Sequence, residues 1–400
     1  MNSWEIEMNN ITQLDVSKVP KELIFLLDVI KMENITDIAE KYKKSLDQMD
    51  WDHILKLVLH HRLYPLLYSK ISVLEKMRIP TKVVKTISYY YQKNTFQMLH
   101  LCGQMEYVSK LFISNGISPL FLKGPVLATD LYGDISLRTS GDLDVLISIE
   151  DLERAEELLI EEGYIKDEYI QTVLNDWKWR HHHFTYFHPK KGIKLEIHWR
   201  LNPAPTKEPS FHELWNRKRV STITKYPVYI LGSEDLFFFL VTHGARHGWS
   251  RLRWLLDIHM LVQKELHWPG LRNLLHKYKT IHIAGQALLL TCNLLDTEIT
   301  EEMEPLIKSN RSQLLAQQAI FYSERMINLH TEPVPHDISK YHSRHLFSLM
   351  SIQQKIMFIL STLHPYYMDK ETLPLPKKLH FLYFPLRPFL LMWRRGSRQV

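Results

Sequence analysis

Residues 118–149 read SPLFLKGPVLATDLYGDISLRTSGDLDVLISI, and this stretch decides the fold. It begins with a short apolar segment that ends at Gly124. A helical pattern follows, with Pro125 in its first turn. The stretch ends with the apolar segment 143–149, which is typical of a buried strand. A strand, a glycine turn, a helix and a second strand together predict an α/β unit in this part of the chain.

The segment after this unit adds further strands. A strongly patterned helix ends at Gly163, and two predicted strands, 182–188 and 192–201, follow around a Pro-Lys-Lys-Gly turn. The proline-rich residues 202–210 then read as a connector. We therefore expect a small mixed β-sheet in the centre of the chain.

Glycine content and distribution predict helical flanks on both sides of this sheet. The chain has 13 glycines in 400 residues and none before Gly103. Because glycine serves tight turns and bulges, this composition excludes a turn-rich β-sandwich or propeller. The sequence predicts an α+β protein with a helical N-terminal region (1–115), a small α/β core (116–230) and a helical C-terminal domain (231–400).

Charge and targeting signals limit the possible partners and location. Lys and Arg number 50 against 44 Asp and Glu, so the net charge is +6, which suits an anionic substrate but is too mild for a dedicated polyanion binder. Two cysteines predict neither a disulfide framework nor a cysteine zinc site. Residues 1–10 lack the pattern of a signal peptide, and no run approaches the ~20 apolar residues of a membrane span. We expect a cytoplasmic protein without integral membrane association.

Three acidic residues form the sharpest candidate site. Asp142 and Asp144 lie on one face of the predicted strand because side chains alternate along it. Adjacent carboxylates repel unless a cation stabilises them, and their hard oxygens favour Mg²⁺ or Mn²⁺. Glu196 stands alone in an apolar strand, and it completes a cluster for two divalent ions if its strand pairs beside 143–149. The alternative is that these acids simply face solvent.

The join at Gly124 is a candidate phosphate site. The first backbone N–H groups of the following helix point at whatever lies above the strand end, which favours phosphate binding. Lys123 adds a positive charge, and Arg138 lies just ahead of the acidic strand, from which it could reach the same phosphates. We include Ser140, in the same segment, among the nucleotide-binding candidates.

The order of these motifs resembles the nucleotidyltransferase superfamily of the DNA polymerase β type. That superfamily has a glycine-containing turn before a helix, a strand with two acids, and a third acid on a later strand. More narrowly, residues 50–300 resemble a bacterial uncharacterised nucleotidyltransferase family. The motifs that carry the resemblance are Leu122-Lys123-Gly124, Arg138 to Asp144, Gly163-Tyr164 and Leu195-Glu196-Ile197-His198-Trp199.

The resemblance implies a metal-dependent enzyme that moves a nucleoside monophosphate from a nucleoside triphosphate to an acceptor and releases pyrophosphate. The two aspartates and Glu196 would bind the metal ions, and Lys123 and Gly124 would meet the triphosphate. A small molecule, a peptide or protein side chain, and an RNA end all remain open as the acceptor. The superfamily turn usually has serine after glycine, whereas this chain has Pro125. The alternative is therefore a nucleotide-binding or regulatory module without catalysis.

Residues 242–259 offer a further hypothesis. His243 and His247 are four residues apart and share a helix face, and with Asp257 they could form the metal site of a hydrolase. Alternatively, residues 242–259 form a pair of helices that only pack against each other, with Asp257 paired to Arg253. A third interpretation makes arginines of this stretch donors to the nucleotide or the acceptor: Arg246, Arg251 and Arg253.

Two other features are expected to be structural. The histidine run 181–183 is split between two faces if it lies on a strand, and the sequence favours a structural role for His183 and His198 over an approach to Glu196. The aromatic and basic tail, 377–400, could touch a membrane surface or RNA, but such a chain end more often packs on its own protein.

Overall fold

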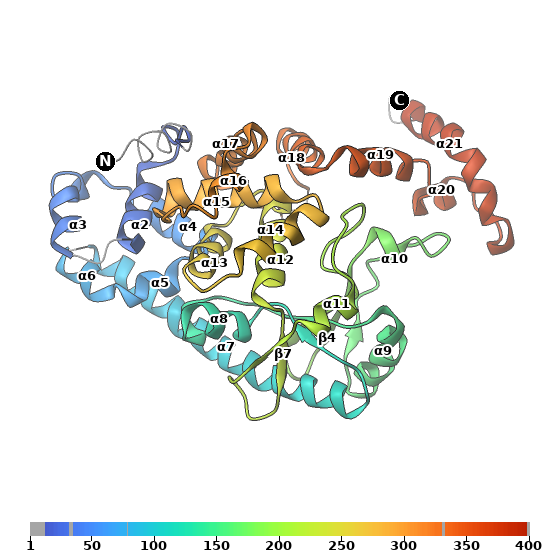
Figure 1. Cartoon of the computed structure of the whole chain (residues 1–400), viewed down its shortest axis with the longest axis horizontal. Coiled ribbons are helices and arrows are strands. Elements are labelled where there is room, and N and C mark those ends of the chain that lie inside the picture. Colours follow the sequence, from blue (N-terminus) through green and yellow to red (C-terminus); the bar gives the residue numbers. More distant parts are fainter. Residues whose placement is uncertain (1–12, 32–34, 78, 330–332, 398–400) are drawn as a thin grey trace.

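The computed structural model describes residues 13–31, 35–77, 79–329 and 333–397 (Figure 1). Residues 1–10, on which the signal-peptide prediction rests, lie outside these ranges, as do the last three residues of the tail. Within the described ranges, no helix combines the length and apolar character that a membrane crossing requires.

The described residues contain a mixed sheet of seven strands in the order β3-β4-β5-β2-β1-β7-β6. Central β2 (Leu143–Leu146) runs parallel to β5 (Ile193–His198) and antiparallel to β1 (Leu120–Phe121). This arrangement confirms the predicted α+β class and the strands expected around residues 120, 145, 185 and 195. The other strands are β3 (Ile165–Lys166), β4 (His183–His188), β6 (Arg219–Ser221) and β7 (Val228–Ile230).

Two helices cover one face of the sheet. The 34-residue helix α7 (Thr81–Ser114) confirms the long helix expected before Gly116, and α9 (Leu152–Glu161) ends before Gly163 as its pattern predicts. Buried side chains of α7 pack with Leu143 and Val145 of β2. These strand residues point into this core, so their neighbours Asp142 and Asp144 point to the opposite face.

The helical flanks of the chain share one core. Buried side chains of α2 (Lys21–Lys31) and α4 (Trp51–His61) belong to the same apolar cluster as those of α12 (Ser233–Arg246), α13 (Leu252–Val262) and α15 (Ile281–Leu295). Figure 1 shows α2 and α4 beside this later group of helices. The predicted boundaries at 115/116 and 230/231 stay predictions, and burial of apolar surface joins the two flanks across them.

The remaining helices connect or extend these layers. They are α3 (Ile35–Tyr42), α5 (Tyr64–Ser69), α6 (Ile71–Lys76), α8 (Pro125–Tyr132), α10 (Trp177–Arg180), α11 (Phe211–Asn216), α14 (Trp268–Lys277), α16 (Glu304–Ile307), α17 (Asn310–Glu324), α18 (His336–Leu349), α19 (Ile352–Ser361), α20 (Tyr367–Thr372) and α21 (Tyr383–Ser397). Short 3-10 turns are η1 (Leu46–Gln48), η2 (Ile135–Leu137), η3 (Ile149–Asp151) and η4 (Lys377–Leu382).

The tail packs on its own protein only in part. Figure 1 shows α19 to α21 extending away from the body of the molecule. Tyr383 and Leu390 form a small separate cluster with Val173, and Arg387 pairs with Asp369 at 2.5 Å. Large apolar side chains nevertheless remain exposed along α21, among them Phe389, Met392 and Trp393. Contact of the tail with a membrane surface or RNA stays the untested alternative to the predicted packing.

A buried ion pair joins the sheet region to the C-terminal helices. Arg138 donates from Nε to Asp257 Oδ1 at 2.8 Å and from its second terminal nitrogen to Asp257 Oδ2 at 2.9 Å. Tyr132 also donates to Asp257 Oδ1. The expected pairing of Asp257 with Arg253 is therefore wrong, because Arg138 and Tyr132 already occupy both carboxylate oxygens of Asp257.

This pair predicts a large loss of stability when one partner is removed. In Asp257→Asn the Arg138 guanidinium stays buried without its counter-charge, so we expect the free energy of unfolding to fall by about 3–5 kcal/mol. Urea denaturation measures the loss. The matched control is Asp52→Asn, which breaks the solvent-exposed Asp52–Lys82 pair, and its transition should shift little. Equal shifts in the two variants would contradict the prediction.

Candidate active site

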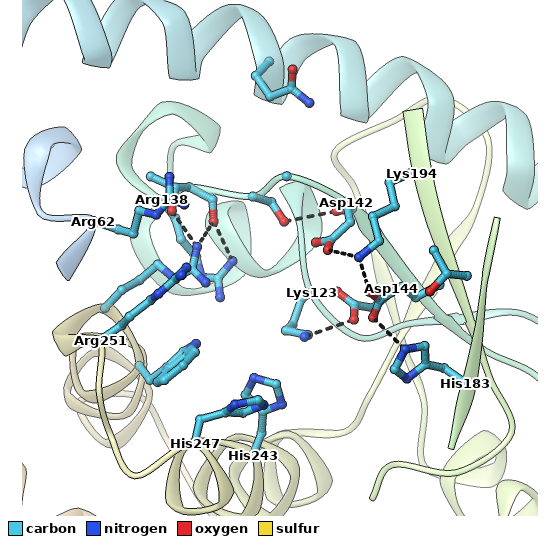
Figure 2. Close-up of a pocket in the computed structure, with 18 of the residues that line it drawn as sticks. Arg62, Lys123, Arg138, Asp142, Asp144, His183, Lys194, His243, His247 and Arg251 are labelled. Carbon is cyan, nitrogen blue, oxygen red and sulfur yellow. Dashed lines mark hydrogen bonds and ion pairs between the residues drawn. The ribbon is translucent and has the colours of Figure 1, made fainter. Parts of the chain in front are cut away.

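A cavity of about 990 Å³ lies between the sheet and the helices α12 and α13 (Figure 2). Residues of β2, β4 and β5 line one wall, and residues of α12 and α13 line the other. Every residue predicted for the acid cluster and the phosphate site lines this cavity except Gly124. Those that do are Lys123, Arg138, Ser140, Asp142, Asp144 and Glu196.

The parallel pairing of β2 with β5 brings two of the predicted acids together. In this register Asp144 is the partner of Glu196. The conditional prediction that the Glu196 strand pairs beside the aspartate strand is therefore confirmed. Asp142 precedes β2 by one residue and lies on the same side of the strand as Asp144, as period-two alternation requires.

Basic side chains surround these carboxylates. Lys123 Nζ lies 3.0 Å from Asp144 Oδ1, and His198 Nε2 lies 3.2 Å from the same oxygen. His198 Nε2 is also 3.6 Å from Glu196 Oε2. Lys194 Nζ lies 2.6 Å from Glu196 Oε1 and 3.7 Å from Asp142 Oδ2. The acids therefore form one charge network, which three basic side chains partly neutralise when His198 is protonated.

The charge network shifts the pKa values of the three acids in different directions. Burial would raise the pKa of Asp144, but Lys123 and His198 outweigh it and lower the pKa. Glu196 behaves in the same way, with its pKa lowered mainly by the hydrogen bond from His198 and the charge of His183. Burial and the nearby charge of Asp144 instead raise the pKa of Asp142. Ionising all three acids together therefore calls for additional positive charge.

The donor set fits a divalent cation. Asp144 Oδ2 is buried and accepts no hydrogen bond from any described residue. One ligand atom each of Asp144, Glu196 and His198 lies within 4.8 Å of the others. Carboxylate oxygens suit Mg²⁺ and Mn²⁺, and an imidazole nitrogen is compatible with transition metals such as Mn²⁺.

His198 had been expected to be structural, and the structure places it among the acids instead. Lys194, Glu196 and His198 alternate along β5, so all three point to the cavity face. This period-two pattern is present in the sequence and could have identified both basic residues. His183 lies on the neighbouring strand β4, with Nε2 3.8 Å from Glu196 Oε2, and it also lines the cavity.

The glycine turn positions Lys123 for its contact with Asp144. Gly124 has φ 83° and ψ −145°, a conformation that residues with a Cβ rarely adopt. Gly124 is the N-cap residue of α8, and Pro125 lies in the first turn of this helix as predicted. Ser140 donates its hydroxyl hydrogen to the backbone oxygen of Asp142 at 3.1 Å, which orients the segment leading to β2.

A family model described as an uncharacterised nucleotidyltransferase matches residues 47–296. The chain belongs to this nucleotidyltransferase family. The matched residues contain the glycine turn, the three acids and the helices of the opposite wall. The family supports a general nucleotidyltransferase activity. No curated protein and no solved structure matches the chain significantly.

The opposite wall of the nucleotidyltransferase cavity is formed by α12 and α13. The rings of His243 and His247 lie 4.7 Å apart beside Trp254. Among the described residues, these histidines belong to no group of three potential metal ligands, because Asp257 is bound to Arg138. The structure therefore does not support the histidine-metal hydrolase. Burial lowers the pKa of His243 well below its usual value, which keeps this ring neutral.

A glycine pair tests the strained turn. Gly124→Ala forces a side chain into a conformation reserved for glycine, so we expect a loss of about 1–3 kcal/mol in the free energy of unfolding. The matched control is Gly103→Ala in the exposed middle of α7, where a Cβ would meet nothing within 4 Å. This control should gain about 0.5–1 kcal/mol. Chemical denaturation measures both values, and a neutral Gly124→Ala would show that the turn tolerates a side chain.

Proposed function

We propose that the protein is a metal-dependent nucleotidyltransferase that moves a nucleoside monophosphate from a nucleoside triphosphate to an acceptor. The observation that carries the proposal is the buried Asp144 carboxylate, which faces Glu196 across the β2–β5 pair and keeps one oxygen without a hydrogen-bond partner among the described residues. A buried carboxylate in this state is stabilised by a bound cation. We place the enzyme in the cytoplasm, as its sequence predicts.

Asp142, Asp144 and Glu196 would hold Mg²⁺ or Mn²⁺, while His198 would keep its contact with Asp144 Oδ1. Divalent ions bound there would neutralise charge on the attacking and leaving oxygens. The added positive charge would also favour the ionised form of Asp142. In the protein alone, burial and the charge of Asp144 raise the pKa of Asp142.

The glycine turn would bind the triphosphate. The N-terminus of α8 directs its partial positive charge toward the strand end, and the Lys123 ammonium lies between the acids and α12. Ser140 would fix the segment that carries Asp142. Arg138 lines the cavity, but Asp257 holds two of its nitrogens, so we propose that it contributes mainly long-range positive charge.

The transfer itself is a substitution at the α-phosphorus. The acceptor oxygen forms a bond to this phosphorus while the bond to the bridging oxygen of the β-phosphate breaks, and pyrophosphate leaves. The acceptor proton passes to solvent. The chain's contribution is to align the two oxygens and to stabilise their charge, which are the main sources of catalysis in phosphoryl and nucleotidyl transfer.

Replacing the acids should abolish turnover. We expect Asp142→Asn, Asp144→Asn and Glu196→Gln each to reduce pyrophosphate release at least about a hundredfold, because each removes negative charge that holds the metal ions. A screen of labelled nucleoside triphosphates against candidate acceptors supplies the assay. Asp337→Asn, at an exposed position on α18, is the control and should retain activity.

The same screen tests the alternative, a nucleotide-binding module without catalysis. This alternative is favoured by Pro125, which stands where the superfamily usually has serine. Nucleotide binding with no pyrophosphate release under any tested acceptor would support the module. Release that persists in all three acid variants would contradict the proposed site.

Metal binding can be measured without turnover. We expect Mn²⁺ to bind the chelator-treated protein, and its paramagnetic resonance signal changes on binding. The Asp144→Asn variant should bind Mn²⁺ at least about tenfold more weakly, because it lacks a charged ligand. Activity should vanish with chelator and return with Mg²⁺. Undiminished Mn²⁺ binding by Asp144→Asn would contradict the assignment of Asp144 as a ligand.

A further inference from the structure

Three arginines form a cluster on the cavity wall away from the acids. Arg62 follows α4, and Arg251 and Arg253 lie at the start of α13. All three line the same cavity as Asp142 and Asp144. Figure 2 shows Arg62 and Arg251 on the side of the cavity opposite Lys194 and His183. We call Arg62, Arg251 and Arg253 the arginine cluster.

Among the residues that the structure describes, the arginine cluster has no counter-charge of its own. Within the described ranges, none of its members forms an ion pair, and the carboxylate beside it, Asp257, is bound by Arg138. Arg253 donates to the backbone oxygen of Thr139 at 2.6 Å and to its hydroxyl at 2.5 Å, both neutral acceptors. Its Nε is buried and has no partner among the described residues.

The energetics of the cluster favour a bound anion. Burial, together with the positive charge of Arg138, lowers the pKa of Arg253 to about 9. Burial and Arg62 also lower the pKa of Arg251. Because guanidinium groups that repel one another in a partly buried site are costly, an anion placed among them recovers energy. Nothing else in the proposed mechanism uses these three side chains.

The arginine cluster is close enough to the acids to act on the same bound molecules. Arg253 is hydrogen-bonded to Thr139, and Asp142 follows Thr139 by three positions. Even a fully extended chain spans at most about 10 Å over that distance. An anion bound by Arg253 therefore lies within the length of a small molecule from Asp142. The glycine turn and Lys123, which would take the triphosphate, belong to a separate segment beside the acids.

We infer that the arginine cluster is a subsite for a phosphate monoester carried by the acceptor substrate. This inference rests on the proposed nucleotidyltransferase function and specifies the chemical class of its acceptor. Arginine presents planar, paired donors that match phosphate oxygens, and a dianion compensates several guanidinium groups better than a single carboxylate does. The acceptor would bind through its phosphate at Arg62, Arg251 and Arg253, with its reacting oxygen directed toward the acids.

Binding of inorganic phosphate tests this subsite directly. The full-length protein is saturated with Mg²⁺ and α,β-methylene ATP, a non-reacting nucleotide analogue, and titrated calorimetrically with phosphate or, at equal ionic strength, with acetate. We expect phosphate to bind with the analogue present and more tightly than acetate. Arg62→Gln combined with Arg251→Gln should weaken phosphate binding at least about tenfold, because each substitution removes a charged hydrogen-bond donor; tenfold in affinity corresponds to about 1.4 kcal/mol.

Controls separate this subsite from the nucleotide site and from effects on folding. Arg344→Gln, at an exposed position outside the cavity, should bind phosphate as the natural chain does. Affinity for a fluorescent ATP analogue should change less than about twofold in the double variant, because the arginines would not contact the triphosphate. Each single variant is titrated as well, so a folding defect in the double variant leaves the test intact.

Four outcomes would overturn the inference. They are no phosphate binding by the natural chain, equal binding of acetate, displacement of phosphate by the nucleotide analogue, and equal loss of phosphate and nucleotide affinity in the arginine variants. The last two would assign the arginines to the triphosphate. Failure of the proposed function looks different: nucleotide would not bind the natural chain, while phosphate would still bind and still depend on Arg62 and Arg251.

Discussion

The parallel pairing of β2 with β5 is the constraint on which the rest of the site depends. It places Asp144 opposite Glu196, and burial makes two neighbouring negative charges costly there. The surrounding basic groups offset this electrostatic cost. Lys123 comes from the turn before α8, while Lys194 and His198 come from the same strand as Glu196. The unusual backbone at Gly124 is thus part of the means by which the acids remain ionised.

The Arg138–Asp257 pair extends this organisation to the helical flank. Because both side chains are buried and the hydrogen bonds are bidentate, α13 is held against the segment that leads into β2. That attachment fixes the second wall of the cavity, which carries His243, His247 and the arginine cluster. The modest net charge of +6 therefore conceals an uneven distribution: the acids have basic partners on the sheet side, whereas the arginine cluster has no ion-pair partner among the described residues.

Local periodicity explains how much could be predicted from the sequence. The long helix α7, the glycine-to-helix join and the two acidic strands follow from patterns within a few residues, and so do Asp142, Asp144 and Glu196 as a set. Strands of two or three residues, such as β3 and β7, are too short to show a period. The pairing of Arg138 with Asp257 spans 119 positions, so the sequence alone suggests the nearer Arg253 as the partner of Asp257. Arg62 could not be linked to α13 because only the fold brings them together.

The two oxygens of Asp144 show how this carboxylate could bind a cation. Lys123 and His198 both contact Oδ1, and Oδ2 has no hydrogen-bond partner among the described residues. A cation bound through Oδ2 would not need to displace either basic group. Lys123 would then still neutralise part of the carboxylate charge while remaining next to the proposed triphosphate site. The lysine and the histidine therefore hold the carboxylate in place and need not compete with the metal, which limits the reorganisation that binding requires.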